Sequence, residues 1–140
     1  MSTTVTIQEA KRIAYELGTR FLKLRRKRSG KPPEEPVLVS KEPIARRIEA
    51  ELTQELGVSV QEMREAVKFA HAVHKMVATC GPKARKVLLD CRFDAKKIES
   101  VARTARPRQV YELGEIAAGR PPLAKPRDGI PVLDTERFSE

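Results

Sequence analysis

The sequence predicts an all-α fold, and three observations support this prediction. Apolar residues recur every three or four positions along most of the chain, which is the spacing of one buried helix face. Capping residues at one end and Gly or Pro at the other divide these stretches into separate helices. Hydrophobic residues make up 40% of the 140 residues but aromatic residues only 4%, and Trp is absent. The expected core is therefore aliphatic and rich in Ala, which suits packed helices better than a sheet.

The chain divides into three predicted regions. Residues 1–40 should hold an amphipathic helix with a basic end, followed by a Pro-rich linker. Residues 41–119 should form a helix-turn-helix domain, and residues 120–140, which contain four prolines, a Pro-rich extended tail. Within these regions the apolar stripes and the stops place helices near residues 6–27, 42–56, 60–80, 83–91, 95–105 and 107–118.

The first predicted helix begins with a capping box, because Thr6 is followed three residues later by Glu9. Its apolar stripe consists of Ala10, Ile13, Ala14, Leu17, Phe21 and Leu24. Gly18 interrupts this helix at a cost of about 1 kcal/mol relative to Ala, so it should mark close packing or a bend. Three prolines exclude helix between residues 29 and 40, where residues 37–39 are expected to be extended.

The remaining helices have their own start and stop signals. The second accommodates Pro43 in its first turn and is expected to bury Ile44, Ile48 and Leu52. The inward face of the long third helix should consist of Met63, Ala66, Val67, Ala70, Val73, Val77 and Cys80. Asp94 should cap the fifth helix. The last helix should begin at Pro107, carry the stripe Val110, Leu113, Ile116 and Ala117, and be closed by Gly119.

The segment from residue 52 to residue 67 has the pattern of a helix-turn-helix corner. Gly57 tolerates a positive φ at the end of one helix, and Ser59 with Glu62 forms a capping box at the start of the next. Apolar or small residues stand where two steeply crossing helices need them: Leu52, Leu56, Val58, Met63 and Ala66. The outer face of the second helix then carries Gln61, Arg64, Glu65 and Lys68, which predicts entry into a DNA major groove.

The charge balance favours a polyanionic partner. The chain has 28 Lys and Arg against 19 Asp and Glu, a net charge of +9. Residues 20–31 include seven basic residues and no acid, and residues 83–108 include nine basic residues and three acids. Residues 41–72, by contrast, hold five basic residues and six Glu, so phosphate contacts must come from outside the corner.

These patterns assign a role in DNA binding to ten residues. Ser59 would contact a phosphate or a base, and Lys68 would project into the groove. Gln suits adenine, Arg suits guanine and Glu can accept from cytosine, which gives base contacts to Gln61, Arg64 and Glu65. Phosphates, or an adjacent minor groove reached by a flexible arm, would be contacted by Arg25, Arg26, Lys27, Arg28 and Lys31. A homodimer is expected, because helix-turn-helix proteins usually bind two half-sites.

Residues 44–119 resemble the central DNA-binding domain of ParB/KorB-type partition proteins. The likeness rests on the corner leading into a long helix, on the Gly-Pro-Lys-Ala-Arg start at residues 81–85, on an Ala- and Arg-rich helix at residues 94–105, and on Pro107 with Gln109. The resemblance implies helix-turn-helix DNA binding, with later residues gripping the backbone. The Gly-Glu-Arg-Arg type motif of the family's CTP-binding domain is absent from the sequence, so the nucleotide switch is not implied.

Two other binding functions stay open. A protein–protein adaptor in a nucleoprotein complex, with non-specific nucleic-acid contacts, agrees with the acidic corner and with a partner bound through the C-terminal tail. Such an adaptor would show little preference among duplexes. An RNA-binding protein agrees less well, because four Phe, two Tyr and no Trp provide few stacking platforms.

Other classes of function find little support. The glycines form no phosphate-binding loop and no nucleophile has a base partner at a recognisable spacing, so neither enzymatic activity nor a cofactor is expected. His71, His74, Cys80 and Cys91 match no zinc-binding spacing, and the cysteines are expected to be reduced thiols. The sequence has no apolar run long enough to span a membrane and no secretory signal, which predicts a cytoplasmic, nucleoid-associated protein without membrane contact.

Overall fold

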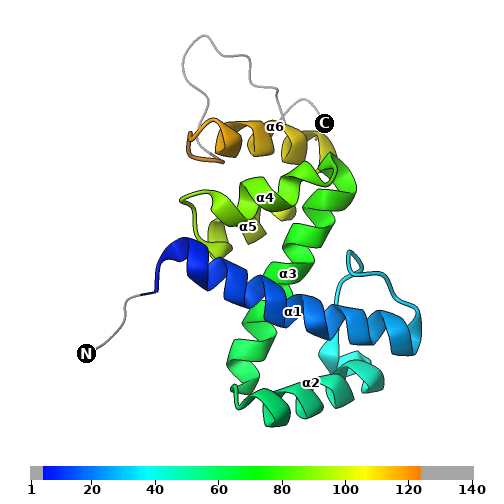
Figure 1. Ribbon diagram of the computed structural model, residues 1–140. Helices are drawn as coiled ribbons and strands as arrows, with labels where there is room; N and C mark the ends of the chain where they lie inside the picture. Colours follow the sequence, from blue (N-terminus) through cyan, green and yellow to red (C-terminus); the bar gives the residue numbers. More distant parts are fainter. Residues whose placement is uncertain (1–4, 124–140) are drawn as a thin grey trace.

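A computed structural model describes residues 5–123, and all regular structure in this range is helical (Figure 1). The elements are α1 (Ile7–Ser29), the short 3-10 helix η1 (Val39–Lys41), α2 (Pro43–Leu56), α3 (Val60–Cys80), α4 (Lys83–Asp90), α5 (Ala95–Ala102) and α6 (Arg106–Ala117). The prediction of an all-α fold is confirmed. Most of the predicted Pro-rich tail lies outside the described residues.

The helix starts follow the capping residues. The Thr6 hydroxyl accepts the Glu9 N–H at 3.1 Å, although it donates to the Glu9 carboxylate instead of completing the reciprocal bond of a capping box. Ser59 and Glu62 form the complete box at the start of α3. Asp94 accepts the Lys97 N–H at 3.0 Å and caps α5. These side chains satisfy backbone donors that a helix leaves free, which is why they mark the boundaries so well.

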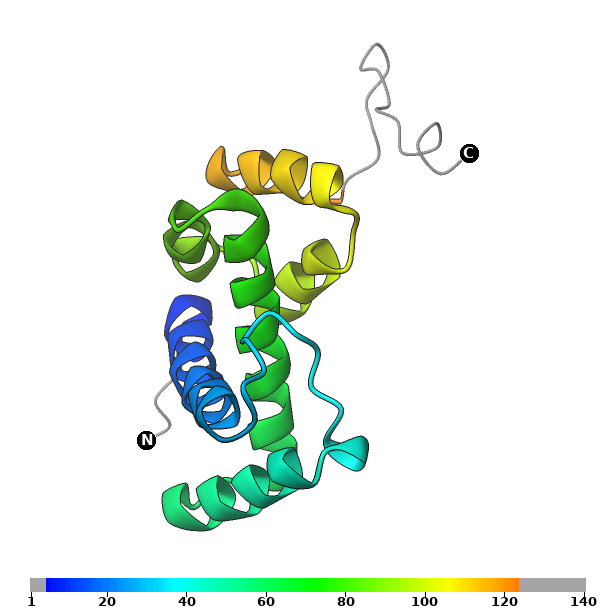
Figure 2. The same ribbon diagram turned by 90° about the vertical axis from the view of Figure 1, so that its right-hand side faces the viewer.

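Helix α3 is the axis of the molecule, and the other helices pack around it (Figures 1 and 2). Its first half shares a core with α1 and α2, formed by Phe21, Leu22, Ala45, Ile48, Leu52, Met63, Val67 and Ala70. Its second half shares a core with α4, α5 and α6, formed by Phe69, Ala72, Val73, Met76, Ala84, Leu88, Ile98, Val101, Ala102 and Ile116. One helix thus contributes to both cores.

Gly18 marks the close approach of α1 to α3. A Cβ atom added there would lie 2.2 Å from the Ala66 carbonyl oxygen and 2.6 Å from the Ala70 Cβ. Such distances are far below van der Waals contact, so only Gly permits this separation of the two helices. Of the two roles predicted for Gly18, the structure supports close packing.

Five residues of the predicted buried faces are exposed: Ile13 by 60%, Ile44 by 37% and Val110 by 55%, together with Ala10 and Ala117. Helix α2 buries the predicted Ile48 and Leu52 together with Ala45 and Glu49, and α6 buries the predicted Ile116 together with Gln109 and Glu112. On α1, α2 and α6, neighbouring helices therefore cover only part of the predicted apolar stripe.

Two local predictions were also wrong. Helix α5 ends at Ala102 and not at residue 105, because the Gln109 side-chain amide donates to the carbonyls of Ala102 and Thr104 at 3.0 and 2.8 Å and stabilises a turn there. In the linker, Val39 begins η1 and is not extended. Among the helices of the described range, none is both long and apolar enough to cross a bilayer.

Candidate nucleic-acid interface

The candidate site begins at the turn between α2 and α3. Gly57 ends α2 with φ 67°, and its N–H and that of Val58 both donate to the Thr53 carbonyl, at 3.0 and 3.3 Å. After this turn α3 leaves at a steep angle to α2 in both views (Figures 1 and 2). The capping box of Ser59 fixes the first turn of α3, so the Ser59 hydroxyl already has a structural partner.

An exposed strip runs along the first half of α3. It contains Gln61, Arg64, Glu65 and Lys68, the four residues predicted to enter the groove. Met63, Ala66 and Val67 on the opposite side of the helix are buried. Within the strip, Gln61 donates its amide to the Glu65 carboxylate at 2.6 Å. The prediction that these four residues share one outer face is therefore confirmed.

Arg64 forms an ion pair with a residue of α2. Its Nε and Nη2 donate to the two Glu49 carboxylate oxygens at 2.7 and 3.1 Å. Only 10% of the Glu49 side chain is exposed, against 55% of the Arg64 side chain. A groove contact by Arg64 would exchange this pairing for a base, which makes Glu49 part of the site although the sequence alone did not indicate it.

Arg25 is not a phosphate-binding residue, because its side chain is fully buried. Its guanidinium donates to the Glu42 carboxylate at 3.0 Å and to the carbonyls of Glu35 and Pro36 at 3.0 and 2.8 Å. It lies seven residues after Gly18 and four after Phe21, on the face of α1 that packs inward. That periodicity was the available signal for burial. The prediction for Arg25 is wrong.

The rest of this basic block is ordered and partly paired. Arg28 makes two hydrogen bonds to Glu51 of α2 at 2.8 and 3.2 Å, and Lys31 lies 3.4 Å from the Glu42 carboxylate. Arg26 and Lys27 are exposed in the last turn of α1. Since α1 continues to Ser29, residues 25–28 do not form a flexible arm, which corrects that alternative.

Helix α5 adds positive charge beside the exposed strip. It packs against α3, as Figure 2 shows. Its residue Glu99 interacts electrostatically with Lys68, Lys96 and Arg103, and burial raises the pKa of Glu99. The side chains of Lys96 and Arg103 are exposed. These two cations were missed as site residues, although the basic composition of residues 83–108 was the signal for them.

The two histidines of α3 have structural neighbours. His71 Nε2 lies 2.9 Å from the Glu34 carbonyl, and His74 Nε2 lies 3.1 Å from the Thr19 hydroxyl while its ring stacks on Tyr15. Burial lowers the pKa of both rings. Among the described residues, no three His, Cys, Asp or Glu side chains are grouped closely enough to hold a metal ion.

Comparisons with protein-family models, with curated proteins and with solved structures find no match for this chain. The resemblance to ParB/KorB-type proteins therefore rests on the spacing of motifs in the sequence. The function has to be argued from the geometry and charge of the site itself.

Proposed function

We propose that the protein binds double-stranded DNA in a sequence-dependent way, as a transcription regulator or a ParB-like partition accessory factor. The observation that carries the proposal is the exposed strip of α3, which begins after a capped turn and has two cations near it, Lys96 on α5 and Arg103 directly after α5. Base contacts are assigned to the strip and phosphate contacts to the cations near it, which is the usual division of labour in DNA recognition.

The pairing of Arg64 with Glu49 sets an energetic cost on base reading. An ion pair between exposed side chains contributes at most about 1 kcal/mol, but Glu49 is nearly buried, so the release of Arg64 costs more than that. A bidentate contact from Arg to guanine discriminates against other bases by roughly 1–3 kcal/mol. Exchange of Glu49 for guanine therefore requires a base contact strong enough to outweigh the loss of this pair, and on other sequences Arg64 stays with Glu49.

The cations on and near the strip supply the affinity that does not depend on sequence. Lys68, Lys96 and Arg103 interact electrostatically with Glu99, as does Glu65, and further exposed Lys and Arg lie on α4 and at the end of α1. Removing one cation that binds a phosphate should lower the dependence of log K on log salt by about 0.9. Replacing Lys68, Lys96 and Arg103 together by Ala should thus weaken binding to every duplex and reduce the salt slope.

The second candidate function is a protein adaptor, and one observation favours it. A groove of about 530 Å³ lies between α1, α3 and α5, with apolar residues such as Ala14, Leu17 and Phe69 and a mainly acidic edge, which consists of Glu62, Glu65, Asp94 and Glu99 together with Lys96. The exposed Ile13 lines the same groove. Apolar surface with an acidic edge suits a protein partner better than DNA.

Selection of bound duplexes from a random pool tests the proposal directly. We expect a consensus site, on which Arg64→Ala costs roughly 1–3 kcal/mol and on random duplex much less. Arg12→Ala is the matched control, because it removes an exposed ion pair, to Asp90 at 2.7 Å, away from the strip. Glu49→Gln should tighten binding, because it frees Arg64 and removes a negative charge.

Two results would count against DNA reading. No consensus after selection would favour the adaptor function. The Arg64→Ala variant could also discriminate between consensus and random duplex as fully as the Arg12→Ala variant does. Arg64 would then not contact bases.

A further inference from the structure

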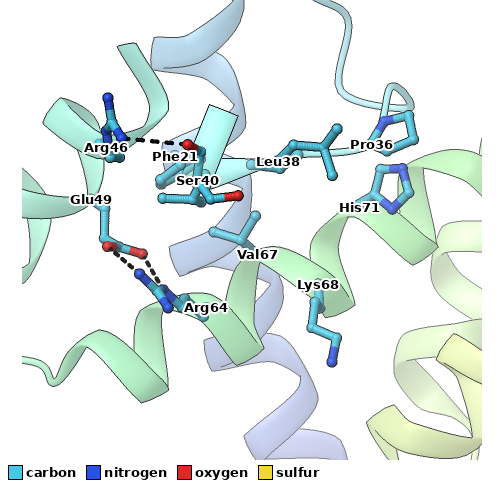
Figure 3. A pocket seen from close by; sticks show the side chains of 12 residues that line it. Phe21, Pro36, Leu38, Ser40, Arg46, Glu49, Arg64, Val67, Lys68 and His71 are labelled. Carbon is cyan, nitrogen blue, oxygen red and sulfur yellow. Dashed lines mark hydrogen bonds and ion pairs between the residues drawn. The ribbon is translucent and has the colours of Figure 1, made fainter. Parts of the chain in front are cut away.

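A cavity of about 470 Å³ lies between the linker and α3 (Figure 3). Phe21 and Val67 line it on the helix side, and Pro36, Val37, Leu38 and Val39 line it on the linker side. Arg46, Glu49 and Arg64 stand together at one end, and His71 stands at the other (Figure 3). The volume is within the range of about 300–1,000 Å³ typical of small-molecule sites, which are likewise mainly apolar with a few polar groups.

Hydrogen bonds hold the linker in place above this cavity. The buried guanidinium of Arg25 binds the carbonyls of Glu35 and Pro36, and the Glu42 carboxylate accepts the Leu38 N–H at 2.9 Å. Collapse of the linker onto Val67 would break these bonds and leave the buried guanidinium with Glu42 but without its two carbonyl acceptors, which is unfavourable. The cavity is therefore a supported feature, with Leu38 as a half-exposed outer wall.

The charge at the polar end is positive. Arg46 and Arg64 face one carboxylate, Glu49, and both oxygens of that carboxylate are already bonded by Arg64. The bond from Arg46 Nη1 to the Ser40 carbonyl is long, at 3.4 Å, so Arg46 can readily take a better acceptor. Lys68 adds a third cation at the rim, with its ammonium directed away from the cavity (Figure 3).

We infer that this cavity binds a small organic anion with an apolar body, such as an aromatic or branched-chain carboxylate or sulfonate. The apolar body lies between Leu38 and Val67, and the anionic group accepts hydrogen bonds from Arg46 and Arg64. The groove between α1, α3 and α5 is a natural contrast, because its polar edge is mainly acidic and repels the same ligand. The inference concerns ligand binding and does not depend on DNA binding.

The probe for this site is 8-anilinonaphthalene-1-sulfonate, whose fluorescence rises in apolar surroundings. We expect saturable binding of one probe per chain, with shifts in the methyl NMR signals of Leu38, Val39 and Val67. The uncharged analogue N-phenyl-1-naphthylamine should bind more weakly, since it lacks the anion. Shifts of Ile7, Ile13 and Leu17 instead would place the probe in the other groove and overturn the inference.

Charge reversal at one end of the cavity tests the assigned contact. Arg46→Glu should weaken probe binding at least about five-fold, while Arg47→Glu, the same change one residue along α2 and outside the cavity, should not. Leu38→Asp, at a side chain that is already 54% exposed, should also weaken binding without disturbing the fold. Equal affinity of the Arg46 and Arg47 variants for the probe would overturn the proposed contact.

Discussion

Replacement of Gly18 by Ala would have two opposite effects on the stability of the protein. Helix propensity alone says that Gly18→Ala stabilises the protein by about 1 kcal/mol. Packing between α1 and α3 predicts a loss of stability, because the new Cβ would lie 2.2 Å from the Ala66 carbonyl oxygen and 2.6 Å from the Ala70 Cβ. Neither group can rotate away, so α1 has to move off α3.

The expected net effect follows from the nature of the clash. Overpacking typically costs roughly 1–3 kcal/mol, and a clash with backbone belongs at the upper end of that range. After the gain in helix propensity, Gly18→Ala should lower the free energy of unfolding by about 2 kcal/mol. For a domain of this size the melting temperature should fall by roughly 8 °C.

Urea unfolding followed by circular dichroism at the helical minimum measures this effect. Gly114→Ala in α6 is the matched control, because no heavy atom lies within 4 Å of its added Cβ. The control should gain up to about 1 kcal/mol. If Gly18→Ala proves as stable as Gly114→Ala, the close approach of α1 and α3 at this position is refuted.

Three further predictions concern single side chains. Arg25→Ala should lower the free energy of unfolding by about 3 kcal/mol or more, because it leaves Glu42 and two linker carbonyls without their donor, whereas the exposed neighbour Arg26→Ala should change it by less than about 0.5 kcal/mol. Equal urea midpoints for the two variants would contradict the buried role. Burial lowers the pKa of His71 and His74, so the unfolded chain binds protons more readily and stability should be lost as the pH falls below about 6.5. Melting temperatures between pH 7 and pH 5 should drop less for the double variant His71→Gln with His74→Gln, and identical slopes would exclude these rings as the cause. Because Arg64 lines the cavity and also belongs to the strip, saturating anilinonaphthalene sulfonate should weaken duplex binding in fluorescence anisotropy, and unchanged duplex affinity would show that the two sites are independent.

Helix boundaries could be predicted from the sequence because they depend on local chemistry. Ser59 and Glu62 satisfy free backbone groups within one turn, and Gly57 adopts a positive φ that other residues rarely adopt. Such signals act over three or four residues. The end of α5 was misplaced because it depends on Gln109, a side chain from the following helix.

The burial of charged residues could not be read in the same way. Lys11 is buried because its ammonium donates to the carbonyls of Leu88 and Cys91, about eighty residues away in the chain. Arg25 is buried for a similar reason, with acceptors in the linker. A count of charges in the sequence cannot distinguish such buried residues from solvent-exposed ones. The strip on α3 was predicted because its amphipathic pattern is strong, but the pairing of Arg64 with Glu49 required the tertiary structure.

Because α3 contributes to both cores, its two faces differ in how well they tolerate substitution during evolution. One side of the helix determines whether the chain folds, since Met63, Val67, Val73 and Met76 connect the two cores. The other side, at residues 61, 64, 65 and 68, contributes little to either core. Substitutions at residues 61, 65 and 68 should change this surface while leaving the folding of the chain almost unaffected, whereas a substitution of Arg64 also removes the partner of the nearly buried Glu49. At residues 61, 65 and 68 the surface of this helix can therefore change by single substitutions, while at residue 64 a change at residue 49 would have to accompany it.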